Sequence, residues 1–167
     1  MAGSATEPLW QSCANWLCAL EILPSNHRCR WPDATMKDLA YALRDGVLLC
    51  GVASRLDPAS IDQKNVNQRP QMAQFLCLKN IKIFLGACKE AFNLKETDLF
   101  QPSMLYDYTD FARVLQTLSK LSHCEVARKK DVEGFPPRFQ RGGSFNASSV
   151  ARPSTRHAQH EEEIYRY

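Results

Sequence analysis

The sequence predicts an all-α fold, and three observations support that prediction. Apolar residues recur at three- and four-residue steps in four separate stretches, which is the spacing of one helix face. No stretch shows the sustained apolar–polar alternation that marks a half-buried strand. Large apolar residues are plentiful up to about position 122 of the 167 and scarce afterwards, so one helical core is expected before that point.

The first predicted helix spans about 7–22 and carries Trp10 and Trp16 on its apolar face. Pro24-Ser25-Asn26 ends it, because proline cannot continue a helix. A loop over 27–34 follows, in which we expect Trp31 to pack on the core.

The second predicted helix spans about 35–49, with a buried apolar stripe and a polar face that is interrupted by Asp45-Gly46. A charged residue followed by glycine in an otherwise apolar helix suggests that another backbone comes close there. The polar, turn-rich stretch from 53 to 69 separates this helix from the next.

The third predicted helix is long, from Pro70 to about Phe92, because proline suits a first helical turn. Its stripe comprises Met72, Phe75, Leu76, Leu78, Ile81, Phe84, Leu85 and Cys88. A short helical turn is expected over 95–100, and a fourth helix runs from about 107 or 109 to 121. Four main helices with short connecting helices are therefore expected.

The domain is predicted to span 1–125, and 126–167 is predicted to be a disordered regulatory linker. The linker is rich in Gly, Pro, Ser and charge, so it cannot bury enough apolar surface to offset its ordering entropy. Thirteen basic and thirteen acidic residues make 1–125 neutral, which argues against nucleic-acid binding. No apolar run reaches the roughly 18 residues of a membrane span, so no membrane insertion is expected.

The seven cysteines are mostly set among apolar residues, and no CxxC pair or ligand-spaced histidine accompanies them. Reduced thiols in a cytoplasmic protein are the expected state, with no metal site and no cofactor. The start lacks the basic and apolar segments of a signal peptide. No phosphate loop, nucleophile elbow or paired-carboxylate motif is present, so we predict no catalytic residues and no enzyme activity.

The most informative run extends from Leu43 to Cys50 and reads Leu-Arg-Asp-Gly-Val-Leu-Leu-Cys. It resembles the signature of calponin-homology domains. The tryptophan-bearing first helix, Arg69-Pro70, Asn80-Ile81 and a last helix built on Asp110-Phe111 resemble the same family. The resemblance implies an all-helical calponin-homology fold that serves as a binding module.

Within that superfamily, the chain resembles the amino-terminal region of the Vav family of Rho-type guanine-nucleotide exchange factors. The supporting strings are Leu9-Trp10-Gln11, Leu23 to Arg28, Arg69 to Met72, and Gln74 to Ile81. The resemblance covers about 115 residues and implies a module that folds back on the exchange domain of the same polypeptide and inhibits it.

The end of the chain carries three candidate modification sites. Three glutamates and Ile164 precede Tyr165, a pattern suited to the basic substrate grooves of tyrosine kinases. The family resemblance implies that Tyr165 is an inhibitory tyrosine, which a tyrosine kinase modifies and phosphotyrosine-binding domains then bind; an ordinary solvated tyrosine is the alternative. Tyr167 is a second candidate, and Ser144 follows Arg141-Gly142-Gly143 as in a basophilic kinase site.

The linker departs from the family pattern, because 126–156 is basic and serine-rich where the family is acidic. No tyrosine lies between Tyr108 and Tyr165, so no second inhibitory tyrosine upstream is expected. The exchange and lipid-binding domains of the family are absent from these 167 residues, and we therefore expect a fragment or a truncated product.

Two functions of different classes follow. The first is autoinhibition of an exchange domain, with Tyr165 as the switch and the helical domain as a clamp. Phosphorylation adds close to two negative charges and would expel an inserted tyrosine. The alternative is a single-domain actin-binding or cytoskeletal adaptor, but the neutral surface offers little steering toward acidic actin.

Overall fold

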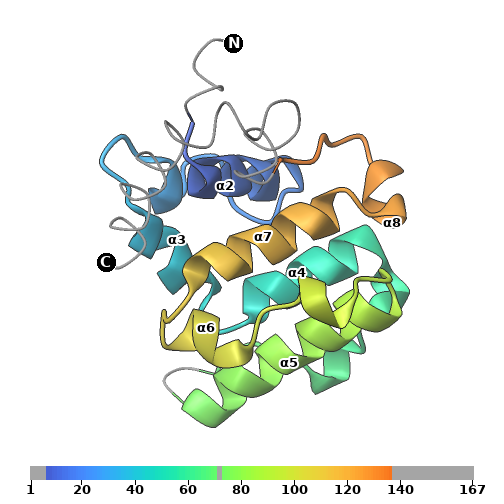
Figure 1. The fold of residues 1–167 in the computed structure, drawn as a ribbon. Coiled ribbons are helices and arrows are strands. Elements are labelled where there is room, and N and C mark those ends of the chain that lie inside the picture. The colour runs from blue at the N-terminus through green and yellow to red at the C-terminus, as the bar shows by residue number, and fades with distance from the viewer. Residues whose placement is uncertain (1–6, 71–72, 137–167) are drawn as a thin grey trace, which may run out of the picture.

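The computed structural model describes residues 7–70 and 73–136, and over these residues the protein is helical with no strand. Figure 1 shows α2 lying above α7, with α4 and α5 beneath α7 and α3 along one side. Helix α2 contacts α7 and α3, α4 contacts α5, and α6 contacts both α5 and α7. The predicted all-α class is confirmed.

Apolar faces of these helices meet in one core, whose fully buried members include Leu17, Leu39, Ile81, Phe84 and Phe111. The α-helices are α2 (Leu9–Ala19), α3 (Met36–Leu43), α4 (Val47–Leu56), α5 (Gln74–Glu90), α6 (Pro102–Tyr106), α7 (Phe111–Ser122) and α8 (Glu125–Arg128). Short 3-10 turns are η1 (Arg28–Arg30), η2 (Pro58–Ser60), η3 (Gln63–Asn65) and η4 (Glu96–Asp98).

The single helix predicted over 35–49 is wrong, because the chain forms two helices there. Helix α3 ends at Leu43 and α4 begins at Val47. Between them Gly46 has a left-handed φ of +80°, which interrupts the helix at a position where only glycine is unstrained. Helix α4 then continues to Leu56, into the stretch that was predicted to be turns.

The long third helix is confirmed as α5, with two corrections. It begins at Gln74 rather than Pro70, and Met72 lies outside the described residues. Phe75 is 73% exposed, although it was predicted to be buried. The buried face of α5 runs through Cys77, Asn80, Ile81, Phe84 and Cys88, so Phe75 falls on the opposite side of the helix.

Trp31 does not pack on the core as predicted, since 49% of its surface is exposed. Its indole Nε1–H donates to the Asn26 carbonyl at 3.1 Å, and the Arg28 guanidinium lies 5.2 Å from its ring. Local contacts therefore hold this tryptophan at the surface of the 27–34 loop.

The turn over 95–100 and the last main helix are confirmed as η4 and α7, and the Asp110 side chain caps α7 by accepting from the Arg113 amide. Two short helices, α6 and α8, were not predicted.

The domain boundary predicted at residue 125 falls at the start of α8. Packing extends beyond this boundary, because Phe135 is only 4% exposed. The segment predicted as a disordered linker, 126–167, therefore includes most of α8 and the buried Phe135, while 137–167 lie outside the described residues.

No helix in the described ranges is both long and apolar enough to cross a bilayer.

Candidate functional surface

The predicted modification sites Ser144, Tyr165 and Tyr167 lie outside the described residues. Within residues 7–70 and 73–136, no group of three or more His, Cys, Asp or Glu side chains is arranged to hold a metal ion. The remaining candidates for a functional role are the signature segment and the exposed faces of the helices.

The signature glycine lies where another backbone comes close, as its sequence context predicts. A Cβ atom at Gly46 would stand 2.6 Å from Asn80 Cβ and 2.9 Å from the Ile81 backbone nitrogen. Both atoms belong to α5. The backbone of a helix cannot move aside to make room, as the end of a flexible side chain could. Gly46 therefore sets how closely the α3–α4 junction approaches the central helix.

Asn80, which is fully buried, ties three segments together at this contact. Its side-chain amide donates to the carbonyls of Asp45 (3.0 Å) and Asn67 (2.9 Å), and its oxygen accepts the Asn67 amide at 2.9 Å. The Cys50 thiol donates to the Asn80 carbonyl at 3.3 Å. Every polar group of the Asn80 side chain is used, so the signature and Asn80 have a structural role.

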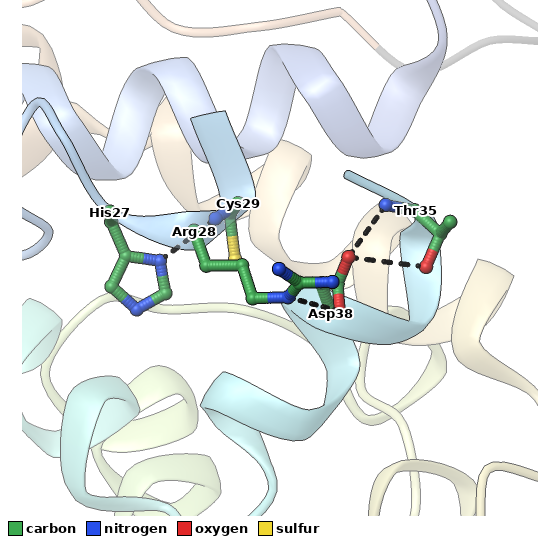
Figure 2. A network of polar contacts seen from close by, with 5 residues as sticks. All are labelled: His27, Arg28, Cys29, Thr35 and Asp38. Carbon is green, nitrogen blue, oxygen red and sulfur yellow. Dashed lines mark hydrogen bonds and ion pairs between the residues drawn. The ribbon is translucent and has the colours of Figure 1, made fainter. Parts of the chain in front are cut away.

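A polar network holds the start of α3 against η1, as Figure 2 shows. Asp38 accepts from the Thr35 amide at 2.8 Å and from Arg28 Nε at 3.2 Å, while His27 Nδ1 accepts the Cys29 amide at 3.0 Å. The Thr35 amide, and then Arg28, hold the pKa of the Asp38 carboxyl below its usual value, against the opposing effect of burial. This network fixes the 27–35 loop, and with it Trp31, beside α3.

The outward side of α3 combines aromatic rings with cations. Lys37, Tyr41 and Arg44 follow one another at four and three residues, which places them on one face. Tyr41 is 72% exposed. We call the set of Lys37, Tyr41, Arg44 and Tyr106 the α3 face.

Two contacts organise the cations of the α3 face. The Arg44 guanidinium lies 4.0 Å from the centre of the Tyr106 ring, and its Nε donates to the Tyr106 carbonyl at 3.0 Å. The Lys37 ammonium lies 5.9 Å from the Tyr108 ring. Exposed aromatic rings and a pre-positioned arginine are the residue types that protein interfaces favour. The α3 face is therefore a candidate interaction surface, and the sequence analysis did not identify it.

The cysteines offer no reactive thiolate among the buried sites. Burial raises the pKa of Cys50 to about 12 and that of Cys29 to about 11, and it also raises the pKa of Cys13, Cys77 and Cys88. All seven cysteines are free. A thiol whose pKa is raised stays protonated at neutral pH and is a poor nucleophile and metal ligand.

The class of protein follows from the helical fold together with the signature glycine and its contact with Asn80. The family model for the calponin homology (CH) domain matches residues 7–127, and the chain belongs to this family. The chain is 50% identical over 129 residues to Protein vav of Drosophila melanogaster, covering 76% of this chain and 16% of that protein. It is 48% identical over 127 residues to the guanine nucleotide exchange factor VAV3 of Homo sapiens, covering 76% and 15%. The resemblance to the Vav family is thereby confirmed.

One curated relative and two solved structures extend the comparison. The proto-oncogene vav of Bos taurus is 42% identical over 157 residues, covering 94% of this chain and 19% of that protein. A structure of Vav1 inhibited by an allosteric inhibitor matches with a TM-score of 0.77 and 47% identity, covering 78% of this chain and 24% of the other. A structure of autoinhibited Vav1 matches with a TM-score of 0.76 and 40% identity, covering 87% and 27%. The chain spans less than a fifth of the length of these curated relatives.

Proposed function

We propose that this chain is the regulatory module of a Rho-family guanine-nucleotide exchange factor and that it inhibits the exchange domain of the same polypeptide in the cytoplasm. The observation that carries the proposal is the likeness to autoinhibited Vav1, which extends over 87% of this chain at 40% identity. The module itself is not catalytic on this proposal, and its partner is the exchange domain.

Tyr165 is the switch in this proposal, because an acidic run precedes it as in a tyrosine-kinase substrate. The neutral ring occupies an inhibitory site, and phosphorylation introduces a dianion that such a site cannot accept without a new cationic partner. The phosphorylated tyrosine then becomes a ligand for phosphotyrosine-binding domains. The helical domain acts as a clamp that raises the local concentration of the tyrosine at the inhibited surface.

The α3 face is the described surface whose chemistry best suits a contact with the exchange domain. It offers an exposed tyrosine and an arginine held in place by the Tyr106 ring. Tyr41→Ala is expected to raise basal exchange at least several-fold, since interface aromatics are frequent hot spots. Phe75→Ala is the matched control, because Phe75 is equally exposed but lies on α5.

The test is nucleotide exchange on a Rho-family GTPase by a longer protein that contains this chain and the exchange domain. Deleting the helical domain and phosphorylating Tyr165 are each expected to raise the basal rate. Tyr165→Phe should stay inhibited and resist activation by the kinase. Equal rates for all of these forms would refute autoinhibition.

A further inference from the structure

The segment after α8 returns to the domain and docks on it. In Figure 1 the orange chain that follows α8 runs back toward α2. At its end Phe135 is only 4% exposed, and its ring lies 5.6 Å from the Trp16 ring of α2, tilted by 49°. An isolated phenylalanine in a polar stretch has thus become part of the core.

Polar side chains at the end of α7 form hydrogen bonds with both the amide and the carbonyl group of Phe135. The Phe135 amide donates to Ser122 Oγ at 3.1 Å, and the Ser122 hydroxyl donates in turn to the Ser119 carbonyl at 2.6 Å. The Phe135 carbonyl accepts from Ser119 Oγ at 2.7 Å and from His123 Nε2 at 3.1 Å. A carbonyl oxygen only accepts hydrogen bonds, so Nε2 of His123 carries a proton here.

These contacts explain why two serines occupy buried positions on a helix face that is otherwise apolar. Ser119 and Ser122 are each 1% exposed, and buried hydroxyls are costly unless they are hydrogen-bonded. Without Phe135, the Ser119 hydroxyl would lose its acceptor and the Trp16 ring would lose an aromatic partner. The site therefore favours the docked segment.

Gly134 makes the close approach possible. A Cβ atom there would lie 2.7 Å from the Ser122 carbonyl oxygen and 2.8 Å from its hydroxyl. The Ser122 carbonyl belongs to the backbone of α7 and cannot move aside cheaply. The docked geometry therefore excludes any side chain at position 134.

We infer that Gly134-Phe135 is a latch, docked between Trp16 and the Ser119–His123 end of α7, which sets the point where the linker leaves the domain and thereby strengthens the clamp. This inference rests on the proposed autoinhibition. An open latch lets the chain leave from α8, near residue 128, and adds the seven residues 129–135 as slack before Tyr165. At roughly 3.3 Å per extended residue this is about 23 Å of extra reach. Slack lowers effective concentration roughly as the −3/2 power of linker length, so length alone should raise basal exchange about 1.4-fold.

Gly134→Ala tests the latch without removing any core atom, and Gly86→Ala is its matched control. Gly86 is an exposed glycine of α5 with nothing within 4 Å of an added Cβ. In the 167-residue chain, Gly134→Ala should speed hydrogen exchange of the Phe135 amide about tenfold or more, as followed by NMR. Gly86→Ala should leave it unchanged. Phe135→Ala is a second opening variant, which removes the ring instead. Parent-like protection of residue 135 in both opening variants would overturn the latch.

The same variants in the longer protein test the coupling. With an open latch, basal exchange should rise about 1.4-fold or more, and Gly86→Ala should match the parent. If the parent is autoinhibited and an open latch leaves exchange unchanged, the latch has no role in the clamp. If deleting the whole helical domain also leaves exchange unchanged, the proposed function fails, and the inferred role of the latch fails with it. The amide-exchange result still decides whether the docked segment exists.

Discussion

Gly46→Ala should strongly destabilise the domain. Among Gly46, Gly51 and Gly86, it is the glycine where an added methyl group should cost the most stability. Gly46 caps α4 with a φ of +80°, and an added Cβ meets Asn80 Cβ at 2.6 Å, the Ile81 nitrogen at 2.9 Å and the Asn80 carbonyl carbon at 3.0 Å. The substitution thus combines backbone strain with a collision against the central helix.

The two costs can be estimated separately. A left-handed conformation costs an L-residue about 1–2 kcal/mol. Forcing one extra carbon into a packed contact costs about 1–3 kcal/mol, because α4 and α5 must separate and the Asn80 hydrogen bonds lengthen. Together these effects should lower the free energy of unfolding by about 2–5 kcal/mol.

Urea unfolding followed by tryptophan fluorescence measures this loss, since Trp10 and Trp16 are buried. With a slope of about 1.5 kcal/mol per molar urea, the midpoint should fall by roughly 1–3 M. Gly86→Ala is again the matched control, because it lies in an open stretch of α5 where alanine favours helix and should raise stability slightly.

A Gly46→Ala variant that unfolds at the same urea concentration as the parent would refute the reasoning. It would mean that the left-handed turn relaxes freely and that the close contact between Gly46 and α5 carries no stability. Destabilisation of Gly86→Ala to the same extent would equally remove the specific role of Gly46.

Other predictions concern stability, thiols and partners. Asn80→Ala should cost about 2–4 kcal/mol in urea unfolding, because it leaves the backbone groups that Asn80 satisfies without partners; a loss below 1 kcal/mol would contradict this. Asp38→Asn should lower stability by about 0.5–1.5 kcal/mol at pH 7, and the deficit should vanish as pH falls through the lowered carboxyl pKa, because only the ionised form is stabilised; a deficit independent of pH would count against the network. A thiol reagent at neutral pH should label only the partly exposed Cys18 and Cys124 in the native state and all seven cysteines in denaturant, and fast labelling of the buried five would be inconsistent with the core. The chain should not co-sediment saturably with actin filaments at physiological salt; micromolar co-sedimentation would instead support the cytoskeletal alternative.

Local patterns in the sequence were sufficient for much of the fold. Apolar residues at three- and four-residue steps around Trp10 and Trp16 predict α2, and the same periodicity predicts most of α5 and α7. The all-helical class follows because helix amphipathicity is a property of neighbouring residues. A glycine after Asp45 also predicted a close backbone approach, and the α5 contact confirms it.

Tertiary contacts decided what periodicity could not. The stripe from 35 to 49 stays apolar through the junction, so periodicity alone does not show that the helix breaks at Gly46, where Asn80 of α5 comes close. Phe75 is exposed because α5 presents its other side to the core.

The C-terminal edge of the domain shows the same division. Large apolar residues become scarce after about position 122, and this change in composition places the end of the domain near residue 125. Phe135 is buried nonetheless, because two serines and a histidine at the end of α7 satisfy its backbone and Trp16 receives its ring. Burial of a single residue depends on partners distant in sequence, and composition contains no information about them.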